Sequence, residues 1–243
     1  MAEFKVPTET VELPSKGILY PESSKLSEGV IEMKYMTAKE EDILSNASYI
    51  KNGTVLDKLF QSLIVSDINY NELLVGDKNA IMIAARILGY GKDYKVNIKG
   101  EEEIIDLSLV ENKPLDESLY TKGVNEFTFV LPHSKNEITF KLLTHGDEQK
   151  VQRELDGLKK LNKNEDPTLT TRLKHVILSV EGKTDKKDIR EFVDKYLLAR
   201  DARALRDYVK SISPDVDLTF FPSDGEAEVS IPIGLGFFWP DAV

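Results

Sequence analysis

Histidine is the residue type most often used for proton transfer and metal binding near neutral pH, and the chain has three. His133, His145 and His175 fall in separate predicted elements, with no cysteine in the chain and no His-x-x-His spacing. His145 lies two residues before Asp147, but both belong to the predicted first turn of a helix. A catalytic base also needs a third group that positions it. The histidines therefore predict neither a metal site nor a general base.

Glycine and carboxylate motifs give no catalytic pattern either. Gly89-Tyr90-Gly91 follows a predicted helix, whereas a phosphate-binding glycine loop precedes one. The chain contains no Gly-x-Ser-x-Gly sequence, which would mark a serine nucleophile. The glutamates at 101–103 fall at a predicted hairpin turn, where a solvated tip explains them, and nothing favours a carboxylate pair for glycoside hydrolysis. We therefore expect a protein that is not an enzyme and that has no cofactor or metal.

The composition describes a soluble globular protein with an acidic surface. Of 243 residues, 41% are hydrophobic and 30% are charged, and the net charge is −10. Such a charge repels nucleic acid and anionic membranes over most of the surface. The chain has no run of 18 apolar residues and its first residues lack the features of a secretory signal, so neither a membrane span nor secretion is predicted. The absence of cysteine excludes disulfides and fits a reducing compartment. Lys159, Lys160 and Lys163 form a candidate basic patch, for which a solvated helix face is the favoured interpretation.

A pattern in one short stretch of the chain, 31–41, recurs later, with Ile, Lys, Thr and a final Glu at the same spacing. The second copy is 138–148, so the offset is 138 − 31 = 107 residues. Each copy alternates apolar and polar residues and breaks at a threonine, which is typical of a strand that leads into a capped helix. Thr37 and Glu40 fit a capping box, while Asp147 and its neighbour Glu148 would lie in the positive first turn of the second helix. The alternative is that unrelated strand-to-helix junctions share these features.

The order of the remaining elements favours duplication. After the junction, each half has a helix that begins at Thr54 or Thr168, a helix capped by Asp77 or Asp201, and a hairpin that contains Gly-Glu. Residues 59–64 align with 173–178, an offset of 173 − 59 = 114, and the aspartates differ by 201 − 77 = 124. The growing offset implies insertions in the second half, such as an extra helix near 186–198. The two copies would form either two domains or one pseudo-symmetric domain.

Local patterns predict the individual elements. Helices are expected at 38–49 and from Thr168 to Val180, and the helix that Asp77 caps is apolar nearly all round, so it should be buried. Hairpins are expected at 94–107 and 216–233. The sequence thus predicts an α+β fold, with a mainly helical body, short β-hairpins and an internal duplication of a strand–helices–hairpin unit. The predicted boundaries are 1–28 for an extended N-terminal arm, 29–109 for the first α+β repeat, 110–124 for a linker, 125–233 for the second α+β repeat and 234–243 for an aromatic C-terminal tail.

Both ends of the chain have features of contact surfaces. Pro7, Pro14 and Pro21 discourage helix and central strand, so residues 1–28 are expected to form an extended arm with a short edge strand. Such an arm lies along its own domain or reaches onto a neighbour. Residues 231–239 alternate large apolar side chains with Pro, Gly and Phe, which predicts an edge strand or an extended peptide. This tail would dock onto the protein's own core, or onto a partner by strand addition or aromatic anchoring.

Three motifs resemble a known family. They are Leu-Pro-Ser-Lys-Gly at 13–17, Thr-x-Lys-Glu-Glu at 37–41 and Phe-Phe-Trp-Pro at 237–240. In this order they resemble the baseplate hub and hub-assembly proteins of contractile-tailed, T-even-type bacteriophages. The resemblance implies a structural or assembly protein, located in the virion tail baseplate or in the host cytoplasm during assembly. It also implies cysteine pairs, like small zinc knuckles, in the two hairpins, and this chain departs from that pattern because it has no cysteine.

Two functional hypotheses follow. The first is a non-enzymatic structural or assembly component of a tail baseplate hub, which binds other phage tail and hub proteins, has no membrane contact and is compatible with a homo-oligomer. The second is a nucleic-acid-associated phage protein, which would use the basic helices near 150–163 and 183–206 and bind DNA in a salt-dependent way. The acidic total charge makes nucleic acid the less favoured partner. The residues expected to contact partners are Leu13, Pro14, Lys16, Gly17, Tyr20, Pro21, Phe237, Phe238, Trp239 and Pro240.

Overall fold

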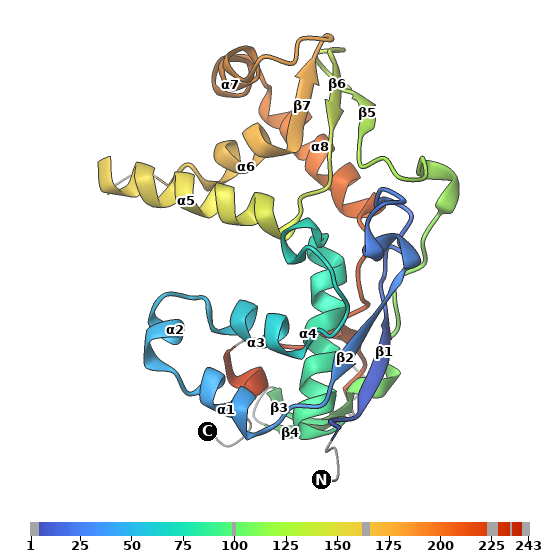
Figure 1. Ribbon diagram of the computed structural model, residues 1–243. Helices are drawn as coiled ribbons and strands as arrows, with labels where there is room; N and C mark the ends of the chain where they lie inside the picture. The colour runs from blue at the N-terminus through green and yellow to red at the C-terminus, as the bar shows by residue number, and fades with distance from the viewer. Residues whose placement is uncertain (1–4, 99–100, 162–165, 223–227, 234, 240–243) are drawn as a thin grey trace.

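The computed structural model describes residues 5–98, 101–161, 166–222, 228–233 and 235–239. The fold is α+β, as the sequence predicted, with helices in the body and small antiparallel sheets around them (Figure 1). The helices are α1 (Ala38–Leu44), α2 (Ala47–Lys51), α3 (Val55–Leu63), α4 (Val75–Tyr90), α5 (His145–Leu161), α6 (Thr168–Val176), α7 (Lys186–Lys195) and α8 (Ala199–Ile212). The strands are β1 (Thr8–Glu12), β2 (Val30–Lys34), β3 (Asp93–Ile98), β4 (Glu101–Asp106), β5 (Phe127–Val130), β6 (Glu137–Phe140), β7 (Ile177–Val180), β8 (Thr219–Phe220) and β9 (Val229–Ser230).

Two lobes share an order of elements, except that the second has α7 where the first has a short 3-10 turn at Tyr70–Glu72. The first contains the β1–β2 hairpin and α1 to α4, and the second contains the β5–β6 hairpin and α5 to α8 (Figure 1). In each lobe, the residue that follows α3 or α6 pairs with the second strand of the hairpin. Met33 of β2 bridges to Ile64 in the first lobe, and Phe140 of β6 pairs with Ile177 in the second. Met33 and Phe140 differ by the offset of the predicted repeat, 140 − 33 = 107.

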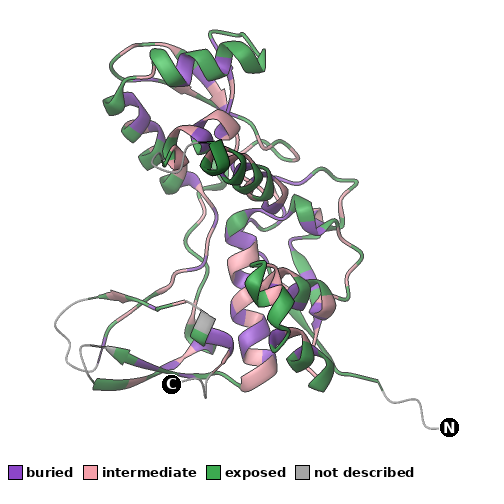
Figure 2. Ribbon diagram, turned by 90° about the vertical axis from the view of Figure 1, so that its left-hand side faces the viewer, coloured by how far each residue is buried: buried purple, intermediate pink, exposed green. Residues whose placement is uncertain are grey.

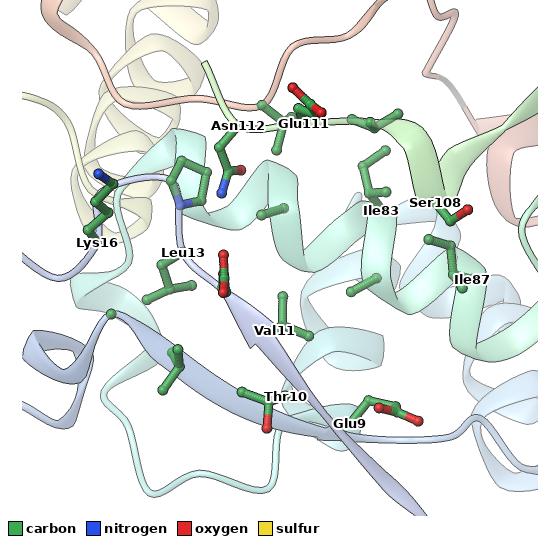
Figure 3. Close-up of a pocket in the computed structure, with 18 of the residues that line it drawn as sticks. Glu9, Thr10, Val11, Leu13, Lys16, Ile83, Ile87, Ser108, Glu111 and Asn112 are labelled. Atoms are coloured by element: carbon green, nitrogen blue, oxygen red, sulfur yellow. The ribbon is translucent and has the colours of Figure 1, made fainter. Parts of the chain in front are cut away.

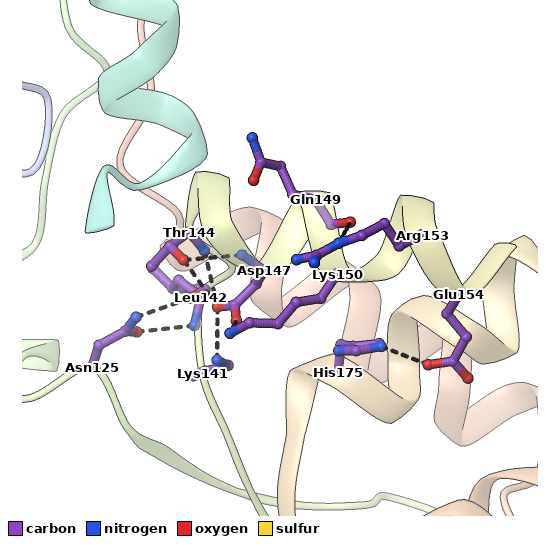
Figure 4. Close-up of polar contacts among 10 residues, drawn as sticks. All are labelled: Asn125, Lys141, Leu142, Thr144, Asp147, Gln149, Lys150, Arg153, Glu154 and His175. Carbon is purple, nitrogen blue, oxygen red and sulfur yellow. Dashed lines mark hydrogen bonds and ion pairs between the residues drawn. The ribbon is translucent and has the colours of Figure 1, made fainter. Parts of the chain in front are cut away.

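The two strand-to-helix junctions make equivalent contacts. Glu40 accepts a hydrogen bond from the backbone amide of Thr37 (3.0 Å), as a capping box predicts, and an ion pair from Lys34 (2.8 Å). In the second lobe, Asp147 accepts from the Thr144 hydroxyl (3.1 Å) and from Lys141 (2.7 Å), as Figure 4 shows. All three residue pairs keep the offset of 107, for example 147 − 40. The equivalence of the junctions therefore extends from sequence to contacts.

The segment expected as an arm is part of the first lobe. Residues 8–12 form β1, which pairs antiparallel with β2. The next residues continue this pairing, because the Leu13 amide donates to the Gly29 carbonyl at 2.8 Å. The predicted edge strand is therefore present. Of the two predicted alternatives, the arm lies along its own domain.

Two predicted helices are interrupted. The helix expected at 38–49 is divided into α1 and α2, because the Asn46 side chain accepts from the amides of Ser48 and Tyr49 and starts a new helix. The helix expected from Thr168 to Val180 ends at Val176, and its last residues instead form β7 against β6. Tertiary pairing with an open strand edge overrides the helical periodicity there. The glutamates 101–103 lie in β4, whereas a hairpin turn was predicted for them.

Asp77 and Asp201 do not cap their helices, contrary to the prediction. The N-cap residues are Leu74 and Leu198, and each aspartate is the third residue inside its helix and fully buried. Each carboxylate accepts hydrogen bonds from the turn that follows the first hairpin strand of its own lobe. Asp77 accepts from Ser15, and Asp201 accepts from the amides of His133 and Ser134. The shared role is therefore to tie the hairpin to the long helix.

The lobes contact each other where α4 begins and α5 begins. The His145 amide donates to the Leu73 carbonyl at 2.7 Å, and Leu74 bridges to Thr144. A Cβ atom at Gly76 would lie 1.8 Å from the Pro214 carbonyl oxygen, so this close approach requires glycine. The predicted linker runs along the body, where residues 111–113 pair with 215–217. Figure 2 shows buried residues along α4, the helix predicted to be buried.

The C-terminal tail was predicted to be an edge strand or an extended peptide, and this was wrong for residues 235–238. Leu235–Phe238 forms a short 3-10 helix beside α4, and the side chains of Phe237 and Phe238 are fully buried. Phe238 packs on Phe60 with ring centroids 5.9 Å apart, and Phe237 packs edge-on against Tyr94 at 4.9 Å. Of the two docking modes considered for the tail, the structure shows docking onto the protein's own core.

Candidate functional site

The chain makes a sharp turn at residues 14–17, directly after the first strand. Lys16 and Gly17 both have positive φ, at 49° and 76°. A Cβ atom at Gly17 would lie 2.5 Å from the Ser27 carbonyl oxygen, so only glycine fits where this turn crosses the chain before β2. The Leu-Pro-Ser-Lys-Gly motif therefore encodes a tight backbone crossing.

Asp77 holds the turn against α4. Its carboxylate accepts hydrogen bonds from the Ser15 amide (2.9 Å), the Ser15 hydroxyl (2.7 Å) and the Tyr20 hydroxyl (2.5 Å). The Tyr20 hydroxyl itself accepts from the amide of Leu74, the N-cap of α4, at 2.8 Å. Burial raises the pKa of Asp77, and the hydrogen bonds from Tyr20 and Ser15 act in the opposite direction. The turn and the start of α4 thus form one hydrogen-bonded unit.

A groove of about 1170 Å³ lies between β1, α4 and the segment 107–115 (Figure 3). Figure 3 shows Val11 and Leu13 on the β1 side and Ile83 and Ile87 on the α4 side. More than half of the residues that line it are apolar. Its apolar side chains include Val11, Leu13, Ile83, Ala84, Ile87 and Val110.

The rim of the groove is negatively charged. Its two lysines are both neutralised, Lys16 by Glu117 at 2.8 Å and Lys113 by Asp215 at 3.6 Å. Three rim glutamates have no cationic partner among the described residues. They are Glu9, Glu12 and Glu111.

The six arm residues predicted to contact partners divide into three groups. Leu13, Pro14 and Lys16 line the groove, but only Lys16 is exposed. Gly17 and Tyr20 are buried and shape the turn from inside. The last of the six, Pro21, is exposed and lines a separate hollow together with Tyr20.

The tail residues predicted to contact partners lie on the other side of α4 and do not join this site. The burial of Phe237 and Phe238 leaves these rings no exposed surface for a partner. Trp239 is half-buried against the core, and Pro240 lies outside the described residues. The structure therefore brings together only part of the predicted contact set, at the arm.

Sequence reasoning missed the α4 side of the groove and the wall at 107–115. Ile83, Ala84 and Ile87 belong to a helix that is apolar nearly all round, and complete burial was the simple interpretation. The one available signal is the small residue pair Ala80 and Ala84, one turn apart on the groove side of α4.

The three histidines lie apart. His145 is buried between the lobes, 3.2 Å from the Lys78 ammonium and 3.4 Å from the Asp57 carboxylate. Burial lowers its pKa, and Lys78 lowers it further. His175 of α6 contacts Glu154 of α5 at 2.9 Å (Figure 4), and His133 is exposed. Within the described ranges, no group of three or more metal-ligating side chains is placed to hold an ion.

The basic helices of the second lobe carry many internal ion pairs. Arg172 binds Glu148, Arg190 binds Glu154 at 2.7 Å, and Lys174 binds Asp194 at 2.6 Å. These pairs remove positive charge that the nucleic-acid hypothesis would use. Lys159 and Lys160 are exposed on α5, and Lys163 lies outside the described residues.

Among the described residues, no helix is long and apolar enough to cross a membrane. Comparisons of the chain with protein-family models, with curated proteins and with solved structures found no match.

Proposed function

We propose that the protein is a non-enzymatic structural or assembly component that works by binding other proteins. The observation that carries this proposal is the groove beside β1, which combines an apolar lining with a polar, negatively charged rim. That combination is typical of protein interaction surfaces. Its volume of about 1170 Å³ exceeds the usual range of small-molecule pockets, about 300–1,000 Å³, which favours a polypeptide ligand.

The resemblance of segments 13–17 and 37–41 to baseplate hub proteins supplies the class of partner. Both motifs have structural roles in the first lobe, the first as the turn held by Asp77 beside the groove and the second as the junction after β2. We therefore propose that the partners are phage tail and baseplate hub proteins. The protein would act in the virion tail baseplate or in the host cytoplasm during assembly.

The test is complex formation by the full-length chain. We would co-express it with the hub and tail proteins of a contractile-tailed phage and measure the mass of the products by size-exclusion chromatography with light scattering. We expect a stable complex with at least one tail protein. Failure of the native chain to form a complex with any of them would refute the function.

A pair of variants then locates the surface. Ile87→Asp places a charge on a half-buried groove residue and should weaken the complex. Leu161→Asp is the matched control, because Leu161 is 86% exposed at the end of α5, and it should leave the complex unchanged. Circular dichroism of both variants would verify that α4 stays folded.

A further inference from the structure

The two lobes differ at one pair of equivalent positions. In the second lobe, Phe129 of β5 stacks on Tyr208 of α8, with ring centroids 4.8 Å apart and an interplanar angle of 17°. Each residue has a defined counterpart. Phe129 lies two residues before the Leu-Pro pair at 131–132, as Val11 lies two residues before the pair at 13–14. Tyr208 lies seven residues after the buried Asp201, as Ala84 lies seven residues after Asp77.

This difference coincides with the groove of the first lobe. Val11 and Ala84 both line the groove, in the place where the second lobe has two stacked rings. A valine and an alanine leave unfilled the space that an aromatic pair occupies between hairpin and long helix. The space left open in the first lobe therefore corresponds to large, flat side chains.

The strand beside the groove has a free edge. β1 and β2 form a two-stranded sheet, so β1 has one strand neighbour. The Leu13 amide donates to Gly29 and the Tyr35 amide donates to Pro7, which fixes the odd-numbered residues of β1 as the ones bonded to β2. The amides and carbonyls of Thr8, Thr10 and Glu12 therefore point away from β2. Thr10 and Glu12 also line the groove.

The charge of the rim restricts the ligand further. Glu9, Glu12 and Glu111 have no cationic partner among the described residues, whereas both rim lysines are paired. A ligand with lysine or arginine beside its apolar side chains would satisfy these carboxylates.

From these observations we propose that the groove binds an extended, basic segment of another protein, which adds as a strand to the free edge of β1. The segment places one large aromatic side chain between Val11 and Ala84, where Phe129 and Tyr208 meet in the second lobe. Backbone hydrogen bonds to the outward-facing groups of Thr8, Thr10 and Glu12 give affinity, and the aromatic pocket and acidic rim give specificity. The inference deepens the proposed function, on which it rests, by naming the chemistry of the partner segment.

The experiment uses a displayed library of random twelve-residue peptides, selected against the native full-length chain. We expect enrichment of peptides in which an aromatic residue alternates with polar ones and is flanked by lysine or arginine. The key variant is Val11→Phe with Ala84→Tyr, which copies the second lobe's side chains into the first and should fold. It should weaken binding of the selected peptides by about tenfold or more, while Ala84→Ser should not.

Strand addition has its own readout. Hydrogen exchange followed by NMR should show slower exchange at the amides of Thr8, Thr10 and Glu12 when a selected peptide is added, and no change at Glu9 and Val11. Thr10→Pro removes one outward amide and should abolish binding, whereas Thr10→Ala should retain it. A library without enrichment, or peptides that bind the filled variant as tightly as the native chain, would overturn the inference. Dimerisation of the chain alone that Thr10→Pro abolishes would assign the edge to a second copy and would overturn it too.

The two proposals fail in different ways. A complex with tail proteins that survives filling of the groove removes the inference and leaves the function. Peptides that bind the groove, together with an absence of any tail complex, remove the function and leave the inference.

Discussion

The two lobes share a scaffold but fill the space between hairpin and long helix differently. The second lobe fills it from within, because Phe129, Tyr208 and Phe140 pack together there. The first lobe leaves this space open as a groove, and instead receives the C-terminal tail elsewhere on its core, where Phe238 packs on Phe60. The two equivalent positions thus carry small side chains, Val11 and Ala84, in the lobe that has the groove, and aromatic ones, Phe129 and Tyr208, in the other lobe.

The strongest way to sharpen this comparison is to remove the tail's contribution to the first lobe. Phe238→Ala should lower the free energy of unfolding by about 3–5 kcal/mol, because the ring is fully buried and its loss leaves a cavity. Phe129→Ala should cost less, since Phe129 is only half-buried. Urea unfolding monitored by circular dichroism measures both. Phe221→Ala is the control, because Phe221 is 71% exposed, and a loss at position 238 no larger than this control would mean that the tail is not part of the core.

The next comparison concerns the two buried aspartates. Asp77→Ala would leave the hydroxyls of Ser15 and Tyr20 and one amide without their acceptor, whereas Asp201→Ala would leave two amides. We expect losses in the free energy of unfolding of about 3 kcal/mol for the first and about 2 kcal/mol for the second. Asp42→Ala, on the exposed side of α1, is the control. Equal losses of unfolding free energy for the two variants would show that the hydrogen bonds from the Ser15 and Tyr20 hydroxyls to Asp77 add no stability.

These aspartates also show how far sequence reasoning reaches. The repeat was predictable because a strand, a threonine and an acidic residue keep their local spacing, and the contacts of Glu40 and Asp147 obey it. The role of Asp77 was not, because its partners Ser15 and Tyr20 lie about 60 residues away and helix-start chemistry gave a sufficient local explanation. The predicted end of the helix at 168–180 was wrong for the same reason. Residues 177–180 form a strand because they pair with the open edge of β6.

The groove was the least predictable feature. Val11 and Ala84, which line it, are smaller than their counterparts Phe129 and Tyr208, and small side chains do not form a recognisable sequence motif. It also depends on the return of 111–113 beside 215–217, which is a contact between distant segments. The arm motif, by contrast, was found by sequence, although most of its residues shape the turn rather than face solvent.

Low pH should weaken both junctions alike. Burial opposes ionisation of Glu40, but hydrogen bonds from Lys34, Thr37 and Ser62 outweigh it and lower its pKa to about 2. Burial likewise opposes ionisation of Asp147, and Lys141 and Lys150 lower its pKa to about 2. The ordinary values are 4.5 and 3.8, so between these values and 2 the unfolded chain binds more protons than the folded one.

Stability from these groups is therefore complete above about pH 4.5 and lost as the pH falls toward 2, by on the order of 2 kcal/mol for each junction. Urea unfolding between pH 6 and pH 2.5 measures it. Glu40→Gln and Asp147→Asn should each reduce the pH dependence by a similar amount. A strong effect at one junction alone would contradict their equivalence.

The smallest expected effect is the most direct test of why the lobes differ. If the groove exists only because two rings are absent, then Val11→Phe with Ala84→Tyr should let the first lobe fill itself as the second does. The new pair should raise the free energy of unfolding by about 1 kcal/mol, the usual contribution of a stacked aromatic pair beyond burial of area. A double-mutant cycle isolates that contribution, since each single ring lacks its partner. A coupling near zero would mean that the rings do not meet, and hence that the backbone between β1 and α4, rather than side-chain size, keeps the groove open.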